Sequence, residues 1–204
     1  MEINVELKFK SYIAHPMTRE RSQVISIQKV SGVNRVRSEE KRKQTLAAEL
    51  EKRGMSDADY AALQQKANAQ FFTTEEGEIY IPGRNFQAFL CHVAHVAPKA
   101  VRAVNYQVVR TAVQCSDLLT GKTEADAKLF GRYVKLEESN ERSWQENQFI
   151  EDFVASGTIS LDETMLSPKD LRSMIEYGAK YLGIGAARSQ AFGRFAIQKW
   201  EASN

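Results

Sequence analysis

The chain has 204 residues, a formal net charge of +2, 43% hydrophobic residues and 26% charged residues. This length can bury a sizeable core, and the composition is ordinary for a soluble globular protein. No apolar run approaches the roughly 20 residues that a membrane helix needs, and the N-terminus lacks the apolar core of a secretory signal. We therefore expect a single domain over residues 1–204, without a membrane segment.

The charges are unevenly distributed. Residues 19–53 hold ten Lys/Arg and five Asp/Glu. Residues 84–115 hold four Lys/Arg and no Asp/Glu, and residues 177–204 hold four Lys/Arg and one Asp/Glu. Residues 116–176 instead hold thirteen acidic and seven basic residues. Basic segments of this kind favour a localised nucleic-acid footprint. The alternative is chance clustering on solvated faces.

In the first third of the chain, Ile3, Val5, Leu7 and Phe9 alternate with polar residues and predict a strand running to residue 13. Residues 17–38 are interpreted as an irregular hairpin. Charged helices are predicted over residues 38–53 and 56–70, because serines precede both and a glycine follows the first. We expect residues 17–70 to form an inserted basic, helical subregion. A helix hairpin within the core is the alternative, but apolar residues are sparse here.

The rest of the chain predicts a hairpin around residues 75–77, a helix over 84–96 and a strand over 104–116. The acidic residues 117–150 are interpreted as a second insertion or a long loop. A strand to residue 161, a helix from Pro168 to Gly183 and a strand over 195–200 follow. The order of these elements is βαββαβ. It predicts an α+β, ferredoxin-like (RRM-like) fold, an antiparallel sheet with helices on one face.

Residues 183–195, the glycine-rich segment, are the most informative stretch. Gly183 and Gly185 allow positive φ and close approach of the backbone to a ligand, while Arg188 and Arg194 carry fixed positive charge. This combination suits a nucleic-acid backbone. The alternative is a helix C-cap followed by a turn into the last strand.

A second motif lies upstream, where residues 79–90 read Ile-Tyr-Ile-Pro-Gly-Arg-Asn-Phe-Gln-Ala-Phe-Leu. Together the two segments resemble the RAMP superfamily of CRISPR-associated RNA-binding proteins. In that superfamily an Ile-Pro-Gly segment opens the first helix and a glycine-rich loop precedes the last strand. The chain looks most like the subunits that line guide RNA in multi-subunit effector complexes. It departs from the pattern at Ala186, Ala187 and Ala191, and at Asn85, where serine is common.

The candidate RNA-binding residues divide by role. Arginines would contact phosphates, Asn85 would hydrogen-bond a sugar or phosphate, and glycines would let the backbone approach the RNA. Aromatic rings would stack on bases, with core packing as the alternative. The site residues are Arg84, Asn85, Gly183, Gly185, Arg188, Phe192, Gly193 and Arg194, with Tyr12 and Tyr106 as further stacking candidates and Arg19, Arg21, Lys29, Arg35 and Arg37 of the insertion as an electrostatic supplement.

The sequence offers little for catalysis. His92 and His95 have a chelating spacing, but no third ligand accompanies them between residues 84 and 115. Cys91 and Cys115 also lack metal-ligand spacing, and two free cysteines fit a reducing cytoplasm. Subunits of this superfamily that cut target RNA carry an acidic residue after the first strand, whereas Glu20 is the first acid here. We therefore expect no metal and no cofactor.

These observations predict a non-catalytic subunit that binds single-stranded guide RNA within a CRISPR-type ribonucleoprotein. Its partners would be RNA and copies of itself or other effector subunits. One alternative is a metal-independent endoribonuclease that uses His15, just beyond the first strand. Another is a phage or mobile-element protein that binds RNA alone or acts as a decoy for an effector complex.

Overall fold

The computed structural model describes residues 1–14, 19–36, 38–67, 70–101, 104–135 and 142–203. The chain divides into two compact units, Met1–His15 with Gln70–Asn204, and Pro16–Ala69. In chain order the elements are β1 (Glu2–Tyr12), α1 (Arg19–Ser31), η1 (Val33–Arg35), α2 (Glu39–Lys52), α3 (Asp57–Ala67), β2 (Phe72–Thr73), β3 (Glu78–Ile81), α4 (Gly83–Val96), α5 (Tyr106–Ala112), β4 (Val113–Cys115), β5 (Leu118–Thr123), η2 (Glu124–Asp126), β6 (Lys128–Lys135), β7 (Arg142–Leu161), α6 (Pro168–Tyr181), η3 (Arg188–Gln190) and β8 (Phe195–Ser203). None of the described helices is long and apolar enough to cross a membrane.

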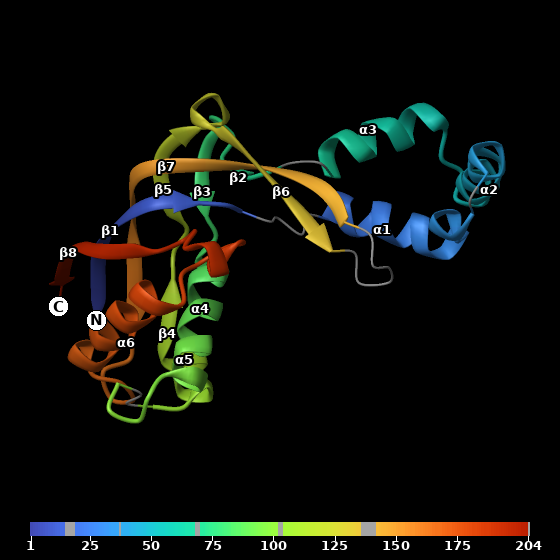
Figure 1. The fold of residues 1–204 in the computed structure, drawn as a ribbon. Helices are drawn as coiled ribbons and strands as arrows, with labels where there is room; N and C mark the ends of the chain where they lie inside the picture. Colours follow the sequence, from blue (N-terminus) through green and yellow to red (C-terminus); the bar gives the residue numbers. More distant parts are fainter. Residues whose placement is uncertain (15–18, 37, 68–69, 102–103, 136–141, 204) are drawn as a thin grey trace. The chain divides into compact units, whose positions relative to one another are not determined.

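The larger unit is built on an antiparallel sheet. Its strands run in the order β2-β3-β5-β7-β1-β8, and β4 and β6 also pair with β7. In the central order β5-β7-β1-β8, β1 and β7 correspond to the first and third strands of a βαββαβ chain and lie in the middle. Strands β5 and β8 correspond to its second and fourth strands and lie on either side of them. Helices α4, α5 and α6 lie together on one side of the sheet (Figure 1). The predicted α+β class with an antiparallel sheet is thus confirmed.

Aromatic packing joins the middle of the sheet to α4. The strand registers place Phe9 beside Phe153 of β7 and Phe195 of β8. The ring of Phe9 stacks on both, with centroid separations of 5.0 and 4.8 Å. Phe86 and Phe89 of α4 contact the ring of Phe195 from the helical side, at 6.3 and 5.6 Å. This buried cluster fixes α4 relative to Phe195, which ends the glycine-rich segment and begins β8.

Two segments of this unit have a structure that their residue patterns do not predict. The pattern of residues 104–116 predicts one strand, but Tyr106–Ala112 is helix α5 and only Val113–Cys115 is strand. The cause is Asn105, whose side chain accepts hydrogen bonds from the backbone of Gln107 and Val108 and caps the helix. In the acidic region 117–150, the described residues form β5, η2, β6 and the start of β7.

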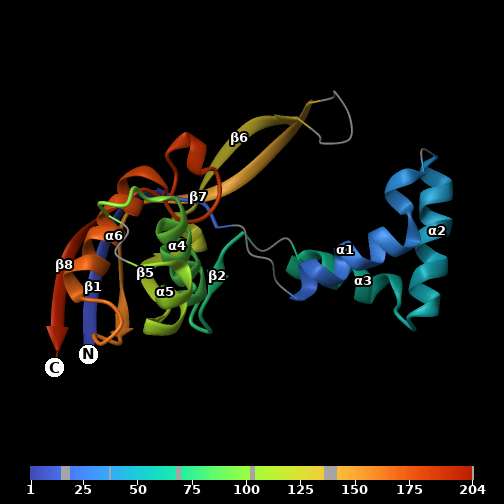
Figure 2. The same cartoon turned by 90° about the horizontal axis from the view of Figure 1, so that it is seen from below.

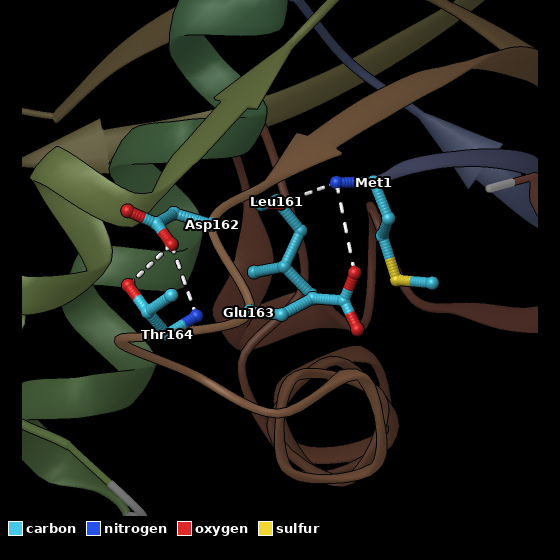
Figure 3. A network of polar contacts seen from close by, with 5 residues as sticks. All are labelled: Met1, Leu161, Asp162, Glu163 and Thr164. Carbon is cyan, nitrogen blue, oxygen red and sulfur yellow. Dashed lines mark hydrogen bonds and ion pairs between the residues drawn. The ribbon is translucent and has the colours of Figure 1, made fainter.

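The end of β7 is held by a small polar network (Figure 3). The Met1 amino group donates to the Leu161 carbonyl at 2.9 Å and lies 3.8 Å from the Glu163 carboxylate. Asp162 accepts hydrogen bonds from the backbone and hydroxyl of Thr164, which lower the pKa of its carboxyl. The turn leads to Ser167, which caps α6 by accepting from the Asp170 backbone N–H.

The smaller unit consists of α1, α2, η1 and α3 (Figure 2). The prediction of an irregular hairpin over residues 17–38 is wrong, because Arg19–Ser31 is a helix. The predicted helices over 38–53 and 56–70 correspond to α2 and α3. A separate small core of buried residues explains α1: Val24 and Ile27 pack with Leu50, Tyr60 and Ala67.

Candidate nucleic-acid interface

The start of α4 is fixed by close packing against the chain between β4 and β5. The Gly83 N–H donates to the Asp117 carboxylate at 2.8 Å. A Cβ at position 83 would lie 2.0 Å from the Cys115 carbonyl oxygen, so no side chain fits there. The glycine of the Ile-Pro-Gly motif therefore serves the packing of this helix end, and Asn85 follows in its first turn.

The glycine-rich segment is tied to the end of β1 by backbone hydrogen bonds. Gly193 donates to Ser11 at 2.8 Å, and Ala186 donates to Ile13 at 2.9 Å. Ile184 donates to Gly193 at 2.9 Å and closes the segment on itself. The segment is therefore an ordered loop whose path is set by β1, and it presents its side chains from a defined backbone.

Besides Gly183, four residues of this loop have backbone angles in the left-handed region of positive φ. Gly185 and Gly193 have φ of +88° and +73°, and Ala187 and Ala191 have φ of +54° and +66°. The two alanines flank the 3₁₀ turn η3, and each conformation costs about 1–2 kcal/mol that glycine would not incur. Ala187 and Ala191 thus hold a backbone conformation that glycine adopts more readily.

A cavity of about 430 Å³ lies between α4 and the glycine-rich segment. We call it the α4 cavity; it is lined by Tyr12, Asn85, Ala88, Phe89, His92, Gly183, Ile184, Gly185, Ala186 and Arg188. Four of the predicted site residues, Asn85, Gly183, Gly185 and Arg188, therefore come together. The two sequence motifs, about 100 residues apart in the chain, thus both line one site.

His92 is a member of this site that the sequence pattern suggests only as a metal ligand. Its exposed side chain lines the α4 cavity. The spacing of residues along the helix could have predicted this position. Ala88, Phe89 and His92 lie three, four and seven residues after Asn85, so all four share one face of α4.

Tyr12 forms part of the cavity wall but is itself fully buried. Among the residues that the structure describes, its hydroxyl has no hydrogen-bond partner. Burial raises the pKa of Tyr12 well above its usual value, so the phenol stays neutral. Its ring contacts Phe9 edge-on at 6.2 Å. In this arrangement the ring offers no free face for the base stacking predicted from the sequence.

The other candidates of the larger unit lie outside the α4 cavity. The Phe192 ring contacts Phe130 and Phe149 of the β6–β7 hairpin, at 5.0 and 5.5 Å. The Arg84 guanidinium carbon lies 5.6 Å from the Phe72 ring centroid. Tyr106 is 47% exposed on α5. Arg194 lines a different cavity, next to β8.

The candidates of the insertion belong to the smaller unit. Arg19, Arg21 and Lys29 lie in α1, and Arg35 lies in η1 with an exposed side chain. None of these four is among the residues that line the α4 cavity. Arg37 and the catalytic candidate His15 lie outside the described residues.

No protein-family model matches the sequence, and no curated protein matches it. Among solved structures, the chain is similar to one in the cryo-EM structure of the Type III-B Cmr-beta bound to cognate target RNA, with a TM-score of 0.55 and 11% identity. The alignment covers 98% of this chain, which spans only 59% of the other. At this identity the likeness shows a shared fold. Cmr6 from Pyrococcus furiosus aligns over 97% of this chain and 98% of its own with 10% identity and a TM-score of 0.35, too low to establish a common fold.

Proposed function

We propose that the chain is a non-catalytic subunit that binds single-stranded guide RNA in a CRISPR-type ribonucleoprotein of the RAMP superfamily. The observation that carries this proposal is the α4 cavity, where Asn85 and Arg188 line the same hollow as the backbone of Gly183 and Gly185. An arginine, an amide and bare backbone are the groups that hold a phosphate and a ribose.

The exposed polar side chains around the site also favour RNA over a small metabolite. The cavity opens beside the exposed side chains of Arg188 and His92, and the segment around it contributes two further exposed polar residues, Ser189 and Gln190. An extended strand can lie over such a surface with one nucleotide in the cavity. RNA single strands are typically held in this way, by backbone contacts along a positively charged groove.

The proposed partners are RNA and other subunits of an effector complex, including copies of this chain. Support comes from the fold shared with a chain of the Cmr-beta complex, which was solved bound to cognate target RNA. The resemblance of the two motifs to RAMP proteins points the same way. A standalone phage or mobile-element RNA binder with the same fold is the alternative assignment, and the neighbouring genes distinguish the two.

The test is binding of a fluorescent single-stranded oligonucleotide, followed by anisotropy over a range of salt concentrations. We expect affinity to fall with salt, with a log-log slope of roughly 0.7 per neutralised phosphate. The double variant Asn85→Ala/Arg188→Ala should bind at least tenfold more weakly, whereas Arg110→Ala, an exposed arginine on α5 outside the cavity, should bind normally. A flat salt response, or tighter binding to duplex DNA, would contradict the proposal.

Endoribonuclease activity is the second candidate function, because His92 lies in the cavity where the RNA backbone is placed. In such a reaction the imidazole would take the proton from a ribose 2′-hydroxyl. The 2′-oxygen would then attack phosphorus as the bond to the 5′-oxygen breaks, and the 5′-oxygen would take a proton from the imidazolium, directly or through water, giving a 2′,3′-cyclic phosphate and a 5′-hydroxyl. Prolonged incubation with RNA should give no such product. A product that forms with the parent protein and is absent with His92→Ala or His15→Ala would identify the chain as an enzyme.

A further inference from the structure

A second cavity lies at the other end of the glycine-rich segment. It has a volume of about 600 Å³ and is lined by Lys10 of β1, Glu176, Ala179 and Lys180 of α6, and residues of the loop and of β8, namely Ala191, Arg194, Phe195, Ala196 and Ile197. We call it the β8 cavity. Arg188 lines the first cavity and Arg194 the second, so the two loop arginines serve different hollows.

The β8 cavity carries uncompensated positive charge. Its lining contains three cationic side chains, Lys10, Lys180 and Arg194, and a single carboxylate, Glu176. That carboxylate is already engaged by Arg172, whose Nε lies 3.0 Å from it. Among the described residues none of the three cations forms a salt bridge.

Arg194 also has an unsatisfied donor. Its Nε is buried, and in the described part of the chain it has no hydrogen-bond acceptor. A buried N–H without a partner costs about 1–3 kcal/mol, and more on a charged group. Such a group is rare in a native protein and calls for an acceptor that the described residues do not supply. An anion with several oxygens would satisfy both the charge and the donor.

We propose that the β8 cavity binds a second phosphate of the RNA, with Lys10, Lys180 and Arg194 as its ligands. This inference rests on the proposed function, because it extends the RNA from the α4 cavity across the turn η3. The guanidinium of Arg194 suits the bidentate geometry of a phosphate, and the two lysines add point charges. The RNA strand would then pass over residues 188–190, with one phosphate on each side of the turn.

Phosphate is favoured over a carboxylate of a partner protein by the placement of the cations. Arg188 and Arg194 belong to one ordered loop, and a single polyanion can satisfy both. No acidic side chain of the described residues reaches the cavity except Glu176. Binding of a protein carboxylate instead is one outcome of the test.

The test compares RNA binding by Lys10→Ala/Lys180→Ala with binding by Lys99→Ala/Lys169→Ala, two exposed lysines that line neither cavity. The first pair should lower RNA affinity at least tenfold at low salt and reduce the salt slope by about 0.7, the contribution of the one phosphate charge that is no longer neutralised. The control pair should leave both unchanged. Lysine acetylation read by mass spectrometry gives a second readout: bound RNA should protect Lys10 and Lys180, but not Lys99 and Lys169.

The outcomes separate this inference from the proposed function. If Asn85→Ala/Arg188→Ala weakens binding while Lys10→Ala/Lys180→Ala retains the parental affinity and slope, the second phosphate site is wrong and the first stands. If neither variant changes binding, both proposals fail. If the lysine variant keeps RNA binding but no longer associates with another subunit, the β8 cavity binds a protein carboxylate and the inference is overturned.

Discussion

Gly185 lies directly against Tyr12, and both residues line the α4 cavity. A Cβ on Gly185 would approach the Tyr12 ring carbon Cε2 to 2.7 Å and the Ile13 carbonyl oxygen to 2.4 Å. Neither neighbour is free to move, because Tyr12 is fully buried and the Ile13 carbonyl accepts the Ala186 hydrogen bond. The close approach of the loop to β1 thus requires a residue without a side chain at position 185.

The first prediction concerns this contact. Gly185→Ala should destabilise the protein by more than Gly77→Ala, although both glycines have nearly equal positive φ, +88° and +86°. A Cβ on Gly77 would have no neighbour within 4 Å, so its variant suffers only the left-handed strain of roughly 1–2 kcal/mol. Urea unfolding measures the difference, and RNA anisotropy should show weakened binding only for Gly185→Ala. Equal free energies of unfolding would mean that the loop moves freely from β1.

The fold can be predicted from the sequence where the periodicity is unambiguous. Alternation in β1 and the Ser167-Pro168 start of α6 predict both elements within a few residues. The failure at α1 has a physical cause. Val24 and Ile27 are β-branched and favour a strand locally, but they are buried against Leu50 and Tyr60, and this packing determines the helix.

The site can be predicted in part for a similar reason. The two motifs can be recognised from the sequence by their residue types, so Asn85, Gly185 and Arg188 can be identified as site residues from them. The partition of the two arginines between two cavities depends on the fold of the loop, which a sequence does not reveal. Phe192 illustrates this point, because its contacts with Phe130 and Phe149 come from a hairpin more than forty residues away in the chain.

The second prediction concerns the Tyr12 hydroxyl. Tyr12→Phe should increase the free energy of unfolding by about 1 kcal/mol, because it removes a buried polar group without a partner among the described residues. Tyr60→Phe is the matched control, since the Tyr60 hydroxyl accepts a hydrogen bond from Gln28 at 3.5 Å and its removal should not stabilise. Destabilisation by Tyr12→Phe would reveal an acceptor or donor outside the described residues.

The buried Tyr12 phenol should also make the free energy of unfolding depend on pH. The pKa of Tyr12 in the folded chain is raised above the unfolded value of about 10. Folding therefore binds a proton that the unfolded chain releases above that pH, so stability is unaffected below about pH 10 and falls as the pH rises further. The Tyr12→Phe variant should lose less stability than the parent between about pH 10 and pH 11. Parallel curves for the two proteins would count against a buried phenol.

The third prediction concerns the two cysteines. Burial, with a smaller contribution from Cys91, raises the pKa of Cys115 to about 12, whereas that of Cys91 is raised less. Because the thiolate is the reactive form, a thiol reagent at about pH 8 should modify Cys91 first and Cys115 only on unfolding. Mass spectrometry of partly labelled protein, with Cys91→Ser as control, measures the order. Rapid labelling of Cys115 in the folded protein would show that β4 opens readily.

The last prediction concerns the helical unit. Residues 16–69 have their own small core, and every buried residue of that core comes from within the unit. Replacing them with a flexible Gly/Ser linker between residues 15 and 70 should leave the larger unit folded, because its sheet and aromatic cluster keep all their members.

RNA binding should nevertheless weaken in that deletion variant. The removed segment carries eleven Lys/Arg and seven Asp/Glu, so the chain loses a net charge of +4. If these cations bind RNA, the salt slope should become less steep by roughly 0.7 for each phosphate that they neutralise in the parent protein. Circular dichroism and anisotropy on the same sample separate the two effects. A variant that unfolds would show that the unit is part of the core, while a folded variant with the parental affinity and slope would remove the insertion, with Arg19, Arg21, Arg35 and Arg37, from the RNA interface.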